Sequence, residues 1–300
     1  MLVVGLVLCL AFRTHAFNLV NATLKTSNGK FRGINLTGIN LNNFPENVTY
    51  IKVVKGVIPE LEEKSVDGLR YLKTLCLKGR KLGKLQPGCF QNLPNLTTLN
   101  LGTNYLETID EHVFNNLPVI ELFLNKNKIK IIHSRAFHGM TQLEILRLNS
   151  NRLNAWDSLW VKNVAKLSMI FCKRNNLSEI PHNAFQHLMV KENVGLYFSK
   201  NSIRKIHQNA FLGFKTINKV IFDRNQLQEL DLGLFKGVEK IGFLSLEKNN
   251  ISLITGINGD LSIGKLNIKY NRFFTCIPTK LQDMCKRIMM KKSPKIICDD

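Results

Sequence analysis

The side chains best suited to catalysis or metal binding are seven histidines and seven cysteines, and their spacing suits neither purpose. His133, His182 and His207 recur at similar offsets along the chain, which is typical of a surface or packing position in a repeat. The sequence contains no Cys-x-x-Cys, His-Glu-x-x-His, phosphate-binding glycine loop or Gly-x-Ser-x-Gly motif. Neighbouring acids such as Asp110 and Glu111 would face opposite ways on a strand. We therefore expect no enzymatic activity, no metal and no cofactor.

The charge of the chain favours binding over chemistry. Lysine and arginine total 42 against 22 aspartates and glutamates, which gives a formal net charge of +20 at pH 7. Such an excess attracts acidic partners, for example anionic protein surfaces, sulfated or phosphorylated glycans, or nucleic acid. The hydrophobic content of 44% is enough for a large core.

The N-terminal segment has the features of a secretion signal. Residues 1–12 are almost entirely apolar, too short to span a bilayer and of suitable length for a signal-peptide core. Thr14 and Ala16 supply small residues before a cleavage point, so we predict a signal peptide over residues 1–16; a buried N-terminal strand is the alternative. No later stretch reaches eighteen uninterrupted apolar residues, and we expect a secreted, extracellular protein without a transmembrane segment.

Six Asn-x-Ser/Thr sequons agree with that location. A single sequon arises easily by chance, whereas six in one chain favour glycosylation in the secretory pathway. The predicted glycosylation sites are Asn21, Asn35, Asn47, Asn95, Asn176 and Asn250.

Leucine and asparagine return at a fixed interval through most of the chain. The pattern Leu-x-x-Leu-x-Leu-x-x-Asn-x-Leu is complete at residues 96–106 and 143–153. Its asparagine recurs at intervals of 22 to 26 residues from position 80, where Arg80 takes its place, and a phenylalanine commonly follows ten residues later. The asparagines are Asn104, Asn127, Asn151, Asn175, Asn201, Asn225, Asn249 and Asn271. A period of this length indicates a solenoid, and two fainter copies precede it at residues 51–53 and 34–36.

These columns resemble the 24-residue leucine-rich repeat of animal extracellular proteins, including Toll-like ectodomains and small matrix proteoglycans. The resemblance covers about residues 70–273. It implies an α/β fold, a horseshoe-shaped solenoid with a concave parallel β-sheet and an irregular convex side. One turn cannot bury its leucines alone, but stacked turns share a continuous core. A buried asparagine column would hydrogen-bond the backbone of neighbouring turns.

Four segments follow from this organisation. They are a signal peptide (1–16), an N-terminal cap with irregular first repeats (17–58), leucine-rich repeats (59–273) and a cysteine-containing C-terminal cap (274–300). Residues 17–75 contain no cysteine, so we expect residues 21–43 to cover the N-terminal end by hydrophobic contact and glycan.

The resemblance also implies disulfide bonding in the C-terminal cap. Related caps carry four cysteines in two bridges, whereas here three follow the last repeat: Cys276, Cys285 and Cys298. The simplest interpretation is one bridge and one spare thiol, which could pair with a partner chain. Spacing does not decide which cysteine is spare. Cys172 and Cys89 take apolar repeat positions, and we expect them to be buried.

Two columns of side chains between the leucines should lie on the concave face. The central column includes the apolar residues Phe123, Phe171, Tyr197 and Ile221, which the core does not need. The column before the asparagine includes Lys126, Arg174, Lys200, Arg224 and Lys248. Aromatic and cationic residues dominate binding hot spots, so we predict a ligand-binding surface. The alternative is that these are solvated strand residues of a chain that is basic everywhere.

With its predicted signal peptide and this class of repeat, the chain resembles the leucine-rich immune proteins that insects secrete. Those proteins carry a C-terminal coiled coil after the repeats, and this sequence does not. The resemblance implies a recognition or scaffold protein of innate immunity that binds an extracellular protein or a microbial, anionic ligand. Nucleic acid is not the expected ligand, because a secreted glycoprotein seldom meets it. The alternatives are a matrix or growth-factor-binding structural protein and a soluble receptor-like decoy.

Overall fold

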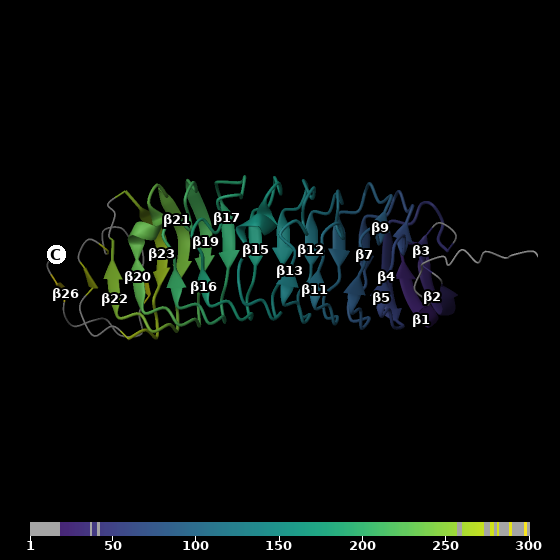
Figure 1. Cartoon of the computed structure of the whole chain (residues 1–300), viewed down its shortest axis with the longest axis horizontal. Helices are drawn as coiled ribbons and strands as arrows, with labels where there is room; N and C mark the ends of the chain where they lie inside the picture. Colours follow the sequence, from purple (N-terminus) through teal and green to yellow (C-terminus); the bar gives the residue numbers. More distant parts are fainter. Residues whose placement is uncertain are drawn as a thin grey trace, which may run out of the picture.

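The repeats build one long stack of strands. The structure is a computed structural model that describes residues 19–36, 38–40, 43–256, 260–272, 277–278, 281, 288–289 and 297–298. Figure 1 shows the strands side by side from the N-terminal end, in purple, to the C-terminal end, in yellow. In spatial order the 13-stranded sheet consists of β2 (Gly29–Leu36), β1 (Leu19–Thr26), β4 (Tyr50–Lys55), β7 (Thr74–Cys76), β10 (Thr98–Asn100), β12 (Glu121–Phe123), β14 (Ile145–Arg147), β15 (Met169–Phe171), β17 (Val194–Tyr197), β19 (Thr216–Ile221), β21 (Lys240–Ser245), β23 (Ser262–Asn267) and β25 (Ile288–Met289).

From β4 onward the sheet is parallel and the repeats are in register. Leu75, Leu99 and Leu122 lie side by side in β7, β10 and β12, and each is fully buried. Because every turn buries the same leucine columns, the core runs through the whole stack. The predicted leucine-rich-repeat solenoid with a concave parallel sheet is confirmed.

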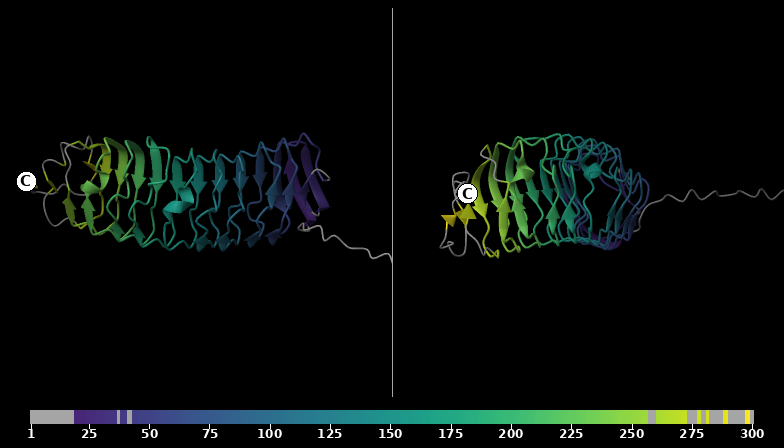
Figure 2. Two further views of the ribbon diagram at one scale, coloured as in Figure 1. Left: turned by 45° about the horizontal axis from the view of Figure 1, so that its top comes forward. Right: turned by 60° about the vertical axis from the view of Figure 1, so that its left-hand side comes forward.

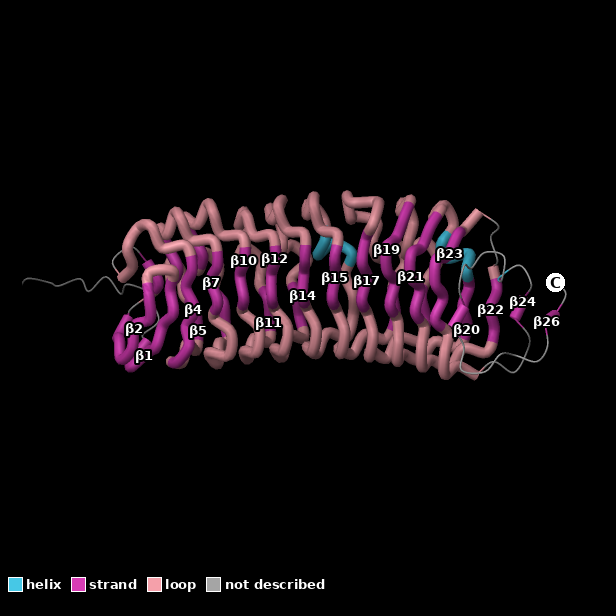
Figure 3. Tube along the Cα trace, turned by 180° about the vertical axis from the view of Figure 1, so that it is seen from behind, coloured by secondary structure: helices cyan, strands magenta, loops and turns pink. Residues whose placement is uncertain are grey.

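The return path on the convex side is made mostly of turns and very short strands (Figure 2). These strands pair as β3 (Ile39–Asn40), β6 (Val66–Asp67) and β9 (Phe90–Gln91); β5 (Glu60–Leu61) and β8 (Lys84–Leu85); β11 (Thr108–Ile109) and β13 (Ile131–Ile132); β16 (Glu179–Ile180) and β18 (Lys205–Ile206); β20 (Glu229–Asp231) and β22 (Leu253–Thr255); and β24 (Ile277–Pro278) and β26 (Ile297–Cys298). Helix is sparse, as Figure 3 shows in cyan: η1 (Ser158–Val161) and η2 (Leu232–Phe235) are single 3₁₀ turns. In the part of the chain that is described, no helix has the length and apolar character needed to cross a membrane.

Aromatic side chains fill the space beneath the return path. The rings of Phe114 and Phe137 stack with centroids 6.1 Å apart, and the column continues through Phe185 further along. Between them one repeat carries Val161 in the phenylalanine position. Trp156 and Trp160 fill that gap, with their rings 5.3 Å apart and their indole N–H groups bonded to backbone carbonyls. The larger indoles thus compensate for the missing phenylalanine.

The asparagine column is a ladder of buried hydrogen bonds. The side-chain nitrogen Nδ2 of Asn151 donates to the carbonyls of Leu124 and Leu148 at 3.0 and 2.9 Å, and its Oδ1 accepts from the Ile129 N–H at 3.1 Å. All the remaining asparagines of the column, from Asn104 to Asn271, make the same three hydrogen bonds. As the sequence predicts, each amide links its own turn to its neighbours.

An antiparallel hairpin closes the N-terminal end. β1 pairs antiparallel with both β2 and β4, and Leu19, Ala22 and Leu24 of β1 are completely buried against the core. The faint repeat at residues 51–53 is a strand of the parallel stack, but the one assigned to residues 34–36 is wrong. That segment belongs to β2, the edge strand of the sheet, which is separated from β4 by the reversed strand β1 and so does not add a turn to the parallel stack.

Several predictions concern residues outside the described part. The signal peptide over residues 1–16, Cys276 and Cys285 lie there, and for Cys298 only the backbone strand β26 is described. The C-terminal disulfide and the segment boundaries therefore stay predictions.

Candidate ligand-binding site on the concave face

Four side chains of the central column form one stack across successive strands. Phe123, Arg147, Phe171 and Tyr197 come from β12, β14, β15 and β17, and each is half-buried. The Arg147 guanidinium lies 5.2 Å from the Phe123 ring centroid and 4.5 Å from that of Phe171. The Phe171 and Tyr197 rings stack with centroids 4.4 Å apart and an interplanar angle of 11°. We call these four residues the aromatic–arginine stack. Their spacing follows from the distance between neighbouring strands, about 4.8 Å.

Two neighbours hold the aromatic–arginine stack in position. Glu121 accepts a charge-assisted hydrogen bond from Nε of Arg147 at 2.5 Å, which orients the guanidinium between the rings. A Cβ at Gly195 would approach the Tyr197 ring to 3.0 Å, so glycine leaves room for the ring to lie flat over its strand. Burial raises the pKa of the Tyr197 phenol, against an opposing effect of Arg147, and the hydroxyl stays protonated at neutral pH.

Ile221 does not extend this exposed surface. It follows Tyr197 in register on β19 but is only 9% exposed. The larger Tyr197 ring stands on one side, and the polar Ser245 stands on the other in β21. Ile221 therefore offers little area to a ligand, contrary to expectation, and the apolar surface ends at Tyr197.

The predicted cations form a second column, which we call the cationic ladder: Lys126, Arg174, Lys200, Arg224 and Lys248. All five have left-handed backbone, with φ between 55° and 58°. Residues other than glycine and asparagine disfavour this conformation by about 1–2 kcal/mol. Gly79 fills the equivalent position in an earlier turn. Glycine would adopt this backbone conformation at lower cost. The backbone conformation therefore does not explain why lysine and arginine occupy these positions.

The centre of the cationic ladder carries unneutralised charge. Among the described residues, no carboxylate lies within 4.0 Å of Arg174, Lys200 or Arg224, whereas Lys248 has Glu247 at 3.8 Å. Repulsion by Arg174, followed by lesser effects that include Arg224, lowers the pKa of Lys200. A bound anion would relieve that repulsion.

A polar cluster borders the ladder on its C-terminal side, and the sequence reasoning missed it. Oδ1 of Asp223 accepts from the Ser245 hydroxyl at 2.5 Å and from the Glu247 N–H at 2.9 Å. Nδ2 of Asn267 donates to Ser245 and Glu247. Burial raises the pKa of the Asp223 carboxyl. Asp223 and Glu247 hold the same repeat position, two residues before the asparagine. This shared position is the sequence signal that could have revealed the cluster. The cluster therefore places negative charge at the Arg224 end of the ladder, where Arg224 acts electrostatically on Asp223.

The remaining candidate residues lie elsewhere. Five of the sequon asparagines are exposed and Asn250 is half-buried, and none belongs to the aromatic–arginine stack or the cationic ladder. The rings of His182 and His207 lie 4.8 Å apart on the convex side, and His207 contacts Glu179. No group of three or more metal-binding side chains occurs among the residues that the structure describes. The Cys89 and Cys172 thiols are buried, and Cys76 is half-buried on the sheet.

Known proteins with the same repeats agree with this architecture. Residues 70–121 and 118–153 match the leucine rich repeat family, and residues 193–257 match the BspA type leucine rich repeat region. The chain is 26% identical over 235 residues to lumican of Coturnix japonica, covering 76% of this chain and 66% of lumican. It is 26% identical over 301 residues to Toll-like receptor 3 of Boselaphus tragocamelus, covering 90% of this chain and 32% of the receptor.

Among solved structures, the TLR13–ssRNA13 complex superposes with a TM-score of 0.62 at 19% identity, covering 78% of this chain and 42% of that one. At this level of identity, the similarity to that structure shows a shared fold. The chain is a leucine-rich-repeat protein, similar both to receptors of innate immunity and to lumican. It spans about a third of the length of the Toll-like receptor 3 that it matches and 66% of lumican.

Proposed function

We propose that the protein is a secreted recognition or scaffold protein of innate immunity that binds an anionic ligand on its concave face and performs no catalysis. The ligand would be an acidic surface of an extracellular protein or a microbial anionic polymer. The similarity to Toll-like receptor 3 supports the immune assignment.

One observation carries the proposal. Arg174, Lys200 and Arg224 lie in successive turns without an ion-pair partner among the described residues, and Arg174 and Lys200 come three residues after the half-buried Phe171 and Tyr197. A ligand with negative charge and an apolar or planar group would contact both columns at once. Burial of aromatic and arginine side chains is what makes a hot spot, and the surrounding charge accelerates encounter.

The test compares two anionic probes, a poly-glutamate peptide and a size-defined sulfated oligosaccharide, by fluorescence anisotropy at several salt concentrations. The binding variant combines Arg174→Gln, Lys200→Gln and Arg224→Gln. The control removes the same charge from the return path by Lys162→Gln, Lys205→Gln and Lys236→Gln, three exposed cations.

We expect the binding variant to have at least tenfold lower affinity for one or both probes. The slope of the logarithm of affinity against the logarithm of salt concentration should become shallower by about one for each cation that no longer pairs with the probe. The control variant should bind nearly as the unmodified protein does. An equal decrease in the two variants would mean that only net charge matters, and the concave face would not be the site.

A matrix or growth-factor-binding structural role remains the second candidate, because lumican is similar over most of this chain. Binding to fibrillar collagen that survives removal of Arg174, Lys200 and Arg224 would favour that role. A soluble receptor-like decoy is the third candidate, and competition with a membrane receptor for the same ligand would identify it.

A further inference from the structure

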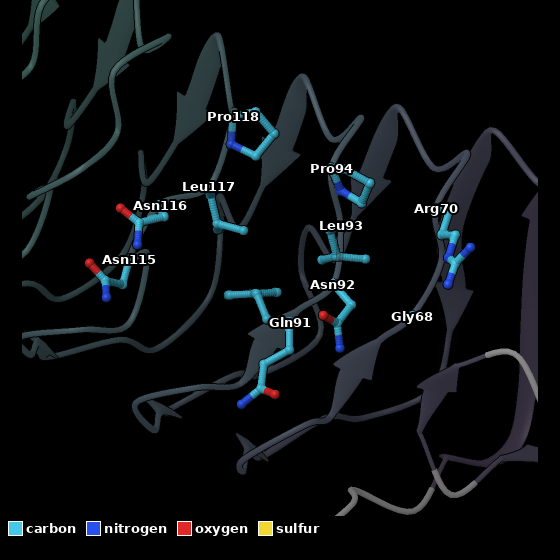
Figure 4. Close-up of a pocket in the computed structure, with 11 residues that line it drawn as sticks. Gly68, Arg70, Gln91, Asn92, Leu93, Pro94, Asn115, Asn116, Leu117 and Pro118 are labelled. Carbon is cyan, nitrogen blue, oxygen red and sulfur yellow. The ribbon is translucent and has the colours of Figure 1, made fainter.

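A hollow lies on one flank of the N-terminal half, away from the concave columns. It has a volume of about 610 Å³ and spans three successive turns, with lining residues between Gly68 and Pro118. In Figure 4 the amide side chains of Gln91, Asn92 and Asn115 stand along its lower part, and Pro94 and Pro118 stand at the upper loops. This volume falls within the range of small-ligand sites, about 300–1,000 Å³.

The lining is rich in amides and poor in charge. Gln91, Asn92, Asn115 and Asn116 supply carboxamides, Arg70 is the one ionised side chain that lines the hollow, and Leu93 with Leu117 forms a buried apolar floor. A carboxamide both donates and accepts hydrogen bonds, as a sugar hydroxyl does. The side-chain amides of Gln91 and Asn115 have no hydrogen-bond partner in the described part of the chain. The hollow thus suits a neutral, hydroxyl-rich ligand better than the anion expected on the concave face.

A glycosylation sequon stands at the rim of this hollow. Asn95 directly follows Pro94 and is exposed, and its Nδ2 donates to the backbone carbonyl of Arg70 at 2.8 Å. Pro94 and Arg70 both line the hollow. The nitrogen to which an N-linked glycan attaches is therefore held against the backbone of Arg70, a residue that lines the hollow. A tethered sugar has a high effective concentration there, so weak contacts suffice to dock it.

We propose that Asn95 carries an N-linked glycan whose first sugars dock in the hollow and cover it. The glycan is transferred from a lipid-linked pyrophosphate donor. The bond between Nδ2 and the sugar C1 forms while the bond from C1 to the pyrophosphate oxygen breaks, and the amide proton leaves with the lipid pyrophosphate or to solvent. The second N–H of the amide keeps its bond to Arg70. The docked glycan is independent of ligand binding on the concave face.

The experiment uses the full chain secreted from animal cells. Peptide mass spectrometry measures occupancy at Asn95 and Asn176, and a time course of endoglycosidase digestion follows release of each glycan from native and from denatured protein. Asn176 is the control because it is exposed and does not line the hollow; if it is unmodified, Asn47 replaces it. The test variant is Gln91→Ala with Asn115→Ala, which removes two of the three lining amides that have no hydrogen-bond partner in the described part of the chain.

In native protein we expect release at Asn95 to be roughly tenfold slower than at the control sequon, as a few hydrogen bonds would produce. The difference should disappear on denaturation and shrink in the test variant. An unmodified Asn95 overturns the proposal, and so do equal native release rates at the two sequons or slow release that persists in the test variant. None of these results would bear on the concave-face probes.

Discussion

The substitution Asn151→Ala tests how much each step of the buried asparagine ladder contributes to stability. The substitution removes three hydrogen bonds, and the three backbone groups that made them differ in whether another partner is left. The Leu124 carbonyl keeps a bond from Asn127, and the Leu148 carbonyl keeps one from Asn175. Only the Ile129 N–H loses its side-chain acceptor completely.

An orphaned buried N–H costs about 1–3 kcal/mol and each of the other two bonds about 0.5–1.5 kcal/mol, so we expect a decrease of about 4 kcal/mol in the free energy of unfolding. A decrease of this size is a large fraction of a typical total of about 5–15 kcal/mol. Urea unfolding followed by circular dichroism measures it. The matched control is Asn154→Ala, the same change at an exposed position of the same turn, with an expected effect within about 0.5 kcal/mol. Decreases below about 1 kcal/mol in both variants would refute the hydrogen-bond reasoning.

Three further predictions concern the concave face and the core. Gly195→Ala should displace the Tyr197 ring and weaken binding of the anionic probe severalfold, with little change in thermal stability; unaltered affinity would show that the ring does not touch the probe. Burial raises the pKa of Cys172 to about 12, so at pH 8 its neutral thiol should resist alkylation in native protein while Cys76 reacts, as measured by peptide mass spectrometry. Because the folded-state pKa of Asp223 is raised, ionising its carboxyl lowers stability as pH rises through that pKa. Asp223→Asn should therefore gain stability relative to the unmodified protein towards neutral pH, and a gain only at low pH would contradict this assignment.

The repeat columns were predictable because stacking makes equivalent positions of all turns neighbours. Once Asn104 and Asn151 share a slot, the residues before them must share a face, and Phe171 must lie beside Tyr197. The spacing alone thus placed the aromatic–arginine stack on adjacent strands and the cationic ladder in the turns that follow the strands, although it did not reveal that Arg147 lies between two rings.

Features that break the period were not predictable. The hairpin of β1 and β2 escaped detection because residues 34–36 imitate the repeat, while only the turn before Gly29 reverses the strand. The column names Tyr197 and Ser245 as the neighbours of Ile221, but the exposed fraction of Ile221 depends on how the side chains pack in three dimensions, which the order of residues does not show. The hollow lined by Gln91 and Asn115 depends on how three return loops diverge, and loop geometry does not follow from the positions of leucines.

Hydroxyl-radical footprinting with and without the sulfated oligosaccharide tests most directly whether the concave face holds the ligand. Oxidation of Phe171 and Tyr197 should fall several-fold when the probe binds, because the probe would shield the two rings. Met189, which is 62% exposed and not part of the concave columns, should be oxidised equally in both samples. Protection of Met189 with no change at Phe171 and Tyr197 would place the ligand elsewhere and contradict a concave binding site.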